Sequence, residues 1–182
     1  MFTYSYVPPR DVKKASAVVT ACFAVGIGLV YSASFIHVLP YLFQTIGIAV
    51  LAVGIFLTTR YIVRRYAYSI VKVGDGDYDF VVNQIQGKKS TVVCRINADE
   101  ITDFFKSESK LPEKYRKGDG KRIVRFDYCQ NMFGDEAYYI FAEINEGKVG
   151  VKFSPNEKLA GIIESLRPKT RENKSSDKKN NA

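Results

Sequence analysis

Three aspartates at alternate positions form the spacing in this chain that most resembles a binding site. Asp75, Asp77 and Asp79 match the D-x-D-x-D opening of a calcium loop, in which carboxylates supply oxygen ligands. The rest of such a loop is missing, because Phe80 stands where it needs glycine and Gln86 where it needs a bidentate glutamate. We therefore interpret this stretch as a plain turn and predict no metal site.

Basic side chains in the polar part of the chain suggest a different chemistry, the binding of phosphate groups. Lysine and arginine donate charge-assisted hydrogen bonds to phosphate oxygens. The candidate contacts to an anionic headgroup are Lys88, Lys89, Arg95, Arg122 and Arg125. The alternative interpretation is that these residues are solvated strand edges, where charges prevent edge-to-edge pairing.

Groups suited to acid–base or nucleophilic catalysis are scarce. His37 is the only histidine, and it lies between two apolar runs, far from the polar part of the chain. Cys22, Cys94 and Cys129 are widely separated and have no C-x-x-C spacing, so we interpret them as reduced core residues. The sequence predicts that the protein is not an enzyme and has no catalytic residue or cofactor.

The two apolar runs carry no acidic, lysine or arginine side chain. As helices, residues 15–36 would reach about 33 Å and residues 41–59 about 28 Å, close to the hydrocarbon thickness of about 30 Å. Pro40 prevents one continuous helix, because it removes a backbone donor. The pattern predicts a two-helix transmembrane hairpin. The alternative is a pair of core helices in a soluble protein.

Basic residues on both sides of the hairpin predict its orientation. The cations at the membrane junction are Lys13, Lys14, Arg60, Arg64 and Arg65. Because the link between the runs has no fixed charge, the positive-inside rule places both termini in the cytoplasm and predicts a two-span protein of the cell membrane. A cleavable signal peptide over residues 1–34 is an alternative, and it would leave the polar part on the same side.

Small side chains recur within both runs and allow close approach of helix backbones. The residues predicted to pack the helices together are Thr20, Ala24, Gly28, Ser32, Gly47 and Gly54. Homodimerisation through the same face is the alternative use of this stripe. Residues 1–14 are basic and aromatic, and we interpret them as an interfacial segment rather than part of a domain.

From residue 66 onward, apolar residues recur with period two, which is typical of strands. The predicted strands are residues 66–73, 78–86, 89–97, 101–107, 121–129, 137–144 and 148–153. Gly-rich stretches at 74–77 and 87–88 predict hairpins, and short turns join the last three strands into a meander. Residues 101–107 also fit a short helix, because Asn97 and Glu100 have capping-box spacing.

One amphipathic helix closes the polar part. Ser154 is the predicted N-cap, with Pro155 and Glu157 as the first and third helical residues. The apolar face comprises Leu159, Ile162, Ile163 and Leu166, and Pro168 ends the helix. Such a face must cover the open end of a bent sheet. Residues 169–182 form a basic tail that we predict to be disordered.

Seven strands followed by one helix resemble a pleckstrin-homology-like (PH-like) barrel or sandwich. The stretch VGVKFSPNEKLAGIIESL is similar to the end of bacterial PH-like domains in small membrane proteins that carry a two-helix hairpin ahead of the domain. The resemblance implies a membrane α-hairpin plus an α+β domain over residues 66–168. It implies no catalytic residue.

The sequence thus predicts a non-enzymatic integral membrane protein that presents a cytoplasmic PH-like binding or scaffold module next to the inner leaflet. The expected partners are anionic membrane lipids, because the net charge of +8 is concentrated at the membrane junction and the C-terminus. A second copy or another membrane protein is a further candidate partner, and nucleic acid is disfavoured. The alternative function is an accessory subunit of a larger transporter or enzyme complex, packed through the hairpin.

Overall fold

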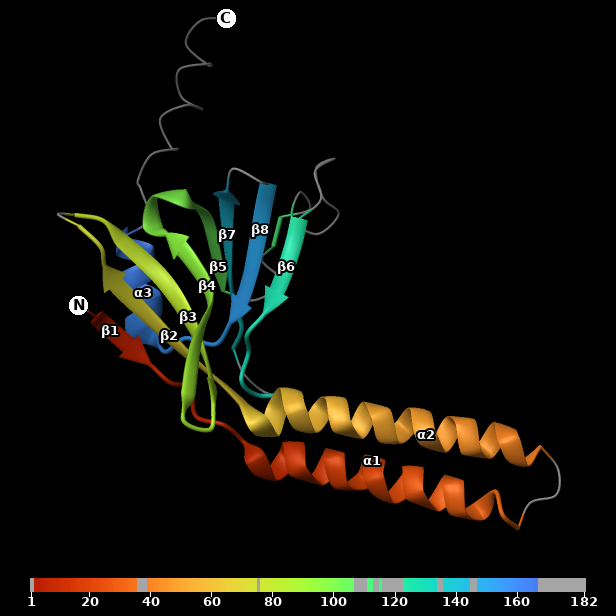
Figure 1. Cartoon of the computed structure of the whole chain (residues 1–182). Coiled ribbons are helices and arrows are strands. Elements are labelled where there is room, and N and C mark those ends of the chain that lie inside the picture. Colours follow the sequence, from red (N-terminus) through yellow and green to blue (C-terminus); the bar gives the residue numbers. More distant parts are fainter. Residues whose placement is uncertain are drawn as a thin grey trace, which may run out of the picture.

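A helical hairpin and a β-rich domain make up the computed structural model (Figure 1). It describes residues 2–35, 39–74, 76–106, 111–112, 115, 123–133, 136–144 and 147–166. His37, Asp75, Arg122, Pro168 and the predicted tail lie outside these residues, so the predictions made for them are not addressed by the structure.

The two apolar runs form α1 (Val12–Ser32) and α2 (Pro40–Leu57), and α2 continues as the π-helix η1 (Thr58–Val63). Asp11 caps α1 by accepting a hydrogen bond from the backbone N–H of Lys14, and Pro40 occupies the first turn of α2. Both helices are long and apolar enough to cross a membrane. In the most apolar 18-residue stretch of each helix, only 17% of the first and 11% of the second is buried. The two helices also project from the domain, which argues against core helices of a soluble protein (Figure 1).

The contact between α1 and α2 uses glycines on both helices. Gly47 and Gly54 are buried as predicted for α2, and a Cβ on Gly47 would lie 2.7 Å from Val30 Cγ2 and 3.0 Å from the Gly26 oxygen. The buried residues of α1 are Ala15, Val19 and Gly26.

The predicted packing stripe on the first helix does not face α2. Thr20 and Ala24 are exposed, Ser32 is half-buried, and a Cβ on Gly28 would meet nothing within 4 Å. Each helical step turns by about 100°, so the stripe that starts at residue 20 lies on a different side of α1 from Val19. The four-residue spacing therefore identified a face of small residues but not the direction in which it points.

Sheet A contains β1 (Phe2–Tyr6), β2 (Arg64–Lys72), β3 (Tyr78–Gln86) and β4 (Lys89–Asn97) in the order β1-β2-β3-β4. All three pairings are antiparallel. The two predicted hairpins are confirmed, and Gly87 adopts a φ of 61°, as a two-residue hairpin loop requires.

The pairing of β1 with β2 corrects the interpretation of the N-terminal segment. Tyr4 is opposite Ile70 and Tyr6 is opposite Tyr68, so the domain begins before the hairpin. Both tyrosines pack against the core. The helical hairpin is consequently an insertion between the first two strands of sheet A, and residues 2–6 belong to the domain.

Sheet B contains β5 (Ile101–Lys106), β6 (Ile123–Asp127), β7 (Tyr138–Ile144) and β8 (Gly147–Phe153) in the order β5-β7-β8-β6. The strand predicted over residues 101–107 is confirmed over Ile101–Lys106, and residue 107 lies outside the described residues. The capping box of Asn97 and Glu100 is also present, but it serves the single-turn helix η2 (Ala98–Glu100) ahead of β5.

The predicted meander is wrong at one pairing. β7 and β8 form an antiparallel hairpin, whereas β6 lies parallel to β8, with Val124 opposite Val149 and Phe126 opposite Val151. Strand periodicity specifies which residues share a face but not which strand is the neighbour. The described residues thus form eight strands in two four-stranded sheets, whereas the sequence predicted a seven-stranded barrel or sandwich.

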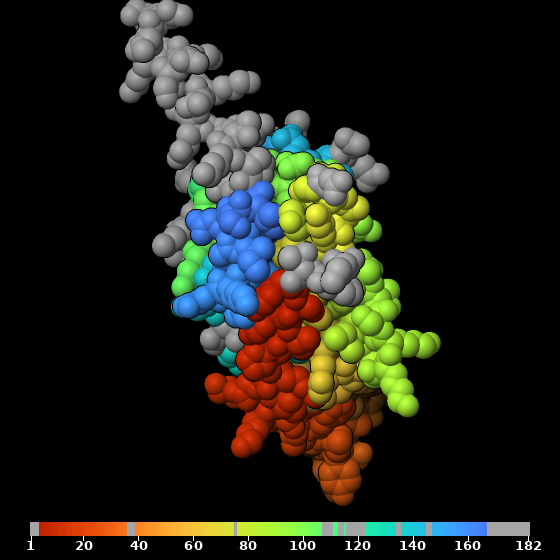
Figure 2. Space-filling model, turned by 90° about the vertical axis from the view of Figure 1, so that its left-hand side faces the viewer, coloured from red at the N-terminus to blue at the C-terminus, as the bar shows by residue number. Residues whose placement is uncertain are grey.

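Helix α3 (Glu157–Leu166) covers the core with the predicted apolar face, and Leu159 and Ile163 are buried there. Its N-cap is Asn156 instead of Ser154, because the Asn156 side chain accepts a hydrogen bond from the Leu159 N–H at 2.9 Å. The Asn156 amide also donates to the Tyr4 hydroxyl at 2.7 Å. Figure 2 shows the red N-terminal residues beside the blue helix.

Candidate functional site

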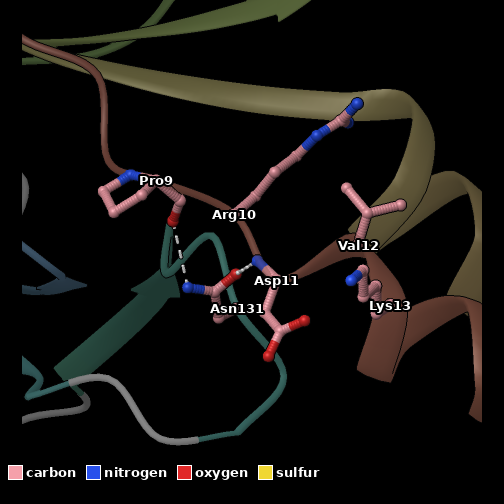
Figure 3. A pocket seen from close by; sticks show the side chains of 6 residues that line it. All are labelled: Pro9, Arg10, Asp11, Val12, Lys13 and Asn131. Atoms are coloured by element: carbon pink, nitrogen blue, oxygen red, sulfur yellow. Dashed lines mark hydrogen bonds between the residues drawn. The ribbon is translucent and has the colours of Figure 1, made fainter.

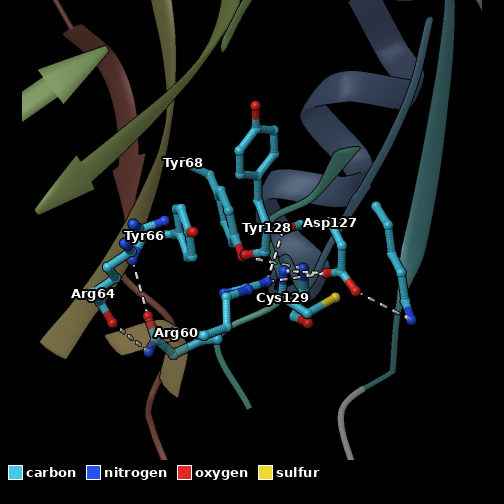
Figure 4. Close-up of polar contacts among 10 residues, drawn as sticks. Arg60, Arg64, Tyr66, Tyr68, Asp127, Tyr128 and Cys129 are labelled. Carbon is cyan, nitrogen blue, oxygen red and sulfur yellow. Dashed lines mark hydrogen bonds and ion pairs between the residues drawn. The ribbon is translucent and has the colours of Figure 1, made fainter. Parts of the chain in front are cut away.

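The short stretch that begins with the last residue of β6, residues 127–131, joins the hairpin to the domain, and we term it the junction segment. Arg60 of η1 donates through Nη2 to the backbone carbonyl oxygen of Asp127 at 2.7 Å. The same nitrogen lies 3.5 Å from the carboxylate oxygen Asp127 Oδ1 (Figure 4). The Arg60 side chain is only 14% exposed. Its guanidinium lies 5.1 Å from the ring centroids of both Tyr61 and Tyr66, at cation–π distance.

Gln130 connects the junction segment to the first residues of β2. Its side chain is almost completely buried, accepts from the Tyr66 N–H at 2.9 Å and donates to the Arg64 oxygen at 3.3 Å. The Gln130 side chain thus satisfies one backbone donor and one backbone acceptor at the start of β2, as the backbone of a paired strand would. The exit of the hairpin into sheet A is thereby held in place.

Asn131 performs the same task at the entry of the hairpin. Its side-chain oxygen accepts from the Asp11 N–H at 2.7 Å, and its amide donates to the Pro9 oxygen at 3.1 Å (Figure 3). Arg10 then bridges entry and exit, since Nη1 donates to the Ile62 oxygen at 2.7 Å. One segment thus fixes both ends of the hairpin, and sequence reasoning missed it because a Gln-Asn pair after a strand has no distinctive pattern.

A shallow pocket of about 510 Å³ opens at the start of α1 (Figure 3). It is lined by Pro9, Arg10, Asp11, Val12, Lys13 and Asn131. The Lys14 backbone N–H lowers the pKa of the Asp11 carboxyl, and the Lys14 ammonium lies 3.2 Å from Asp11. The pocket is therefore a site of mixed charge at the base of the hairpin.

Exposed cations gather at this end of the domain. Arg64 is opposite Gln86, and Gln86 is opposite Lys89, so the β3–β4 turn lies beside the start of β2. Figure 1 shows that turn at the same end of the domain as the hairpin base. We use the term basic collar for the exposed residues Lys13, Lys14, Arg65, Lys88 and Lys89. Arg60 and Arg64, predicted with this group, are instead partly buried at the junction.

The residues predicted to contact a headgroup do not share one surface. Lys88 and Lys89 belong to the basic collar. Arg95 on β4 is paired with the buried Asp79 at 2.5 Å, and Arg125 on β6, in the other sheet, donates to the Tyr115 oxygen. The pairing with Arg95 also gives Asp79, one of the three aspartates with calcium-loop spacing, a structural role as the partner in an ion pair at the start of β3.

The two cysteines of the domain are free thiols, and Cys129 is buried while Cys94 is half-buried against the core. Burial raises the pKa of the Cys94 thiol to about 11 and that of Cys129 to about 11. Both thiols are therefore protonated, and poorly nucleophilic, at neutral pH. This agrees with the prediction that they are reduced core residues.

Comparison with known families places these features in context. A family model described as a bacterial PH-like domain (DUF6106) matches residues 6–171. The matched region includes the hairpin, β2 to β8 and α3, and it begins at the last residue of β1, so the hairpin is part of the family pattern. Neither the comparison with curated proteins nor the comparison with solved structures gives a match.

Proposed function

The chain belongs to the bacterial PH-like domain family, and we propose that it is a non-enzymatic membrane protein that holds a cytoplasmic PH-like binding or scaffold module against the inner leaflet. The observation that carries this proposal is the position of the basic collar, which lies at the base of a hairpin long enough to span a bilayer. Anionic lipids attract each nearby lysine or arginine by about 1 kcal/mol.

The way in which the hairpin enters the domain supports a fixed distance from the membrane. β1 leads into α1 and η1 leads into β2, so both ends of the hairpin continue into adjacent strands of sheet A. The junction segment adds side-chain hydrogen bonds to both ends. A domain attached in this way stays at the bilayer surface, where a weak contact to a lipid or a peptide acts at high effective concentration.

The orientation is tested by protease protection of the full chain with one epitope tag at each terminus. We expect both tags to resist protease in intact spheroplasts and to be digested in inverted vesicles. Digestion of the C-terminal tag in spheroplasts would contradict the proposal.

The role of the basic collar is tested by labelling its lysines with an amine-reactive reagent in the wild-type full chain, at low and at high salt. Reconstituted into neutral and anionic bilayers, the wild-type domain should shield the collar lysines from amine-reactive reagents more strongly in the anionic bilayer. Labelling of the collar lysines that is equal in both bilayers and does not change with salt would show that the collar does not contact the lipid.

The accessory-subunit function has one observation in its favour. Thr20, Ala24 and Gly28 form a face of α1 that α2 leaves uncovered. Small residues allow another transmembrane helix to approach closely. If this function applies, Gly28→Leu should release a co-purifying membrane protein, whereas a module that acts only through lipid would be unaffected.

A further inference from the structure

Several large apolar side chains outside the two helices and their link are exposed, and some of them lie near the hairpin base. The exposed residues of this kind are Val7, Val63, Val73, Val92, Val124, Phe126 and Phe133. Val63 ends η1, and Val7 lies two residues before Pro9, which Asn131 contacts. Val73 lies far from the base, because it follows the end of β2 that is opposite to Arg64.

Phe126 is connected to the hairpin base by a row of aromatic rings. The Arg60 guanidinium lies over Tyr66, the Tyr66 and Tyr128 centroids are 5.4 Å apart, and Tyr128 stacks with Phe126 at 6.1 Å and 9°. Phe126 is nevertheless 42% exposed. The strand that carries it, β6, is an edge strand of sheet B.

Phe133 is placed by the junction segment. It follows Asn131 by two residues, so its Cα lies at most about 7 Å from that of Asn131. Asn131 is itself bonded to Asp11 and Pro9 at the entry to α1. With 58% of its surface exposed, Phe133 is an aromatic side chain in solvent next to the start of the first helix.

The direction of the hairpin shows what these residues face. Transmembrane helices cross close to the bilayer normal, with an average tilt of about 20°. In Figure 1, β6 is the strand of sheet B on the side toward which the hairpin extends. If the hairpin spans the bilayer, this side of the domain is turned to the leaflet that the hairpin enters.

We propose that Phe126 and Phe133 form a second membrane anchor, inserted into the interfacial region of that leaflet. This inference rests on the proposed function. Aromatic rings favour the interface between hydrocarbon and headgroups. Phe126 directly precedes Asp127, which Arg60 contacts, and Phe133 follows Asn131, which binds Asp11, so both residues are close to the base of the hairpin. The domain is thereby held at two points in one orientation.

The chain contains no tryptophan, so single tryptophans report their own surroundings. The experiment uses the full chain in anionic bilayers whose acyl chains carry bromine close to the headgroup or close to the chain end. Four variants are compared: Phe126→Trp, Phe133→Trp, Val73→Trp as the exposed control far from the base, and Ile48→Trp as the reporter of hairpin insertion. Ile48 lies within α2 and is exposed to the surroundings of the hairpin.

We expect blue-shifted emission and quenching by the shallow bromine for Phe126→Trp and Phe133→Trp, quenching by the deep bromine for Ile48→Trp, and no quenching for Val73→Trp. Unquenched tryptophans at 126 and 133, with Ile48→Trp quenched, would overturn the second anchor and leave the membrane hairpin intact. Equal quenching at 73 would overturn the single orientation. An unquenched Ile48→Trp would refute the proposed function and the second anchor together.

A second arm separates lipid from a protein occupant of β6. Phe126→Trp emission is measured over a range of protein-to-lipid ratios. The anchor predicts a blue shift that is independent of dilution with lipid. A shift that disappears on dilution would instead show that another copy of the chain covers β6, and would overturn the proposal.

Discussion

The Arg60 guanidinium of η1 donates to the backbone carbonyl oxygen of Asp127 at 2.7 Å. This hydrogen bond connects the end of the hairpin to the end of β6. The two residues are 67 positions apart in sequence. Arg60 is also enclosed by Tyr61 and Tyr66, which leaves its side chain mostly buried. This contact is the basis of the first prediction.

Arg60→Ala should lower the free energy of unfolding of the domain by about 2 kcal/mol, because a hydrogen bond from a charged donor is lost at a mostly buried position. Asp127 is half-exposed, so solvent screening keeps the ion-pair contribution small. The measurement is thermal unfolding of the full chain in detergent micelles. Lys14→Ala, which removes an exposed i,i+3 pair, is the matched control, and equal midpoints for the two variants would contradict the prediction.

Gly47→Val should destabilise the hairpin by about 1–3 kcal/mol, since overpacking forces the helices apart. The new Cβ would lie 3.0 Å from the Gly26 backbone oxygen and 3.1 Å from the Val30 nitrogen, and backbone atoms cannot move aside as a side chain can. Gly28→Val is the control, because a Cβ there meets open space. Helix-helix proximity is measured by cross-linking of cysteines placed at the hairpin base, and unchanged cross-linking in Gly47→Val would refute the packing observed.

Asn156→Ala should reduce stability by about 1 kcal/mol, the usual effect of losing a helix N-cap. The Leu159 N–H would lose its partner, and the bond to the Tyr4 hydroxyl would disappear. Glu164→Ala, an exposed change within the same helix, should stay within about 0.5 kcal/mol of wild type. Chemical denaturation followed by circular dichroism separates the two. A larger effect at Glu164 would argue against Asn156 as the cap.

A fragment that begins at residue 64 should have an incomplete sheet A, because it lacks β1 and the edge of β2 that pairs with β1 is left free. A peptide of residues 1–9 should restore the strand in trans by β-augmentation. Fluorescence anisotropy of the labelled peptide measures the binding. The control peptide carries Tyr4→Ser and Tyr6→Ser, which removes the side chains that pack on the core. Equal binding of both peptides would show that β1 is not recognised by its register.

The thiols of Cys94 and Cys129 should react slowly below pH 9 and faster toward pH 11, because burial raises the pKa of each to about 11 from an ordinary value of 9.0. The raised pKa favours the protonated thiol in the folded state. Its stabilising effect is therefore complete below pH 9 and is lost as the pH rises to 11. The rate of disulfide exchange with a chromogenic reagent is measured in a Cys22→Ser background. A native-state midpoint near 9, equal to that in denaturant, would contradict the burial of these groups.

Local patterns predicted much of this fold. The apolar runs, the period-two strands from residue 66 and the face of Leu159, Ile162, Ile163 and Leu166 all appear where the sequence places them. Each depends on the geometry of a few consecutive residues, and burying one face of such an element is favourable in any topology that covers it. The resemblance to bacterial PH-like domains, carried by the end of the domain, is confirmed by the family match.

The candidate site depended on contacts that no local pattern contains. Sequence reasoning identified Lys88, Lys89 and the cations that flank the hairpin, but only the register of β2, β3 and β4 brings the β3–β4 turn beside the hairpin base. Asn131 and Gln130 were missed because an amide side chain becomes specific only when a distant backbone segment presents the donor or acceptor it satisfies.

The sequence by itself determined the elements and the faces they bury, because periodicity and charge act over a few residues. Only the tertiary structure decided that β1 joins β2 across the whole hairpin, that β6 runs parallel to β8, and that Gly26 rather than Gly28 meets α2. These choices are made by competition among arrangements of the complete chain. The arrangement that buries the most apolar surface while pairing the backbone polar groups is favoured, and it cannot be compared with its rivals one element at a time.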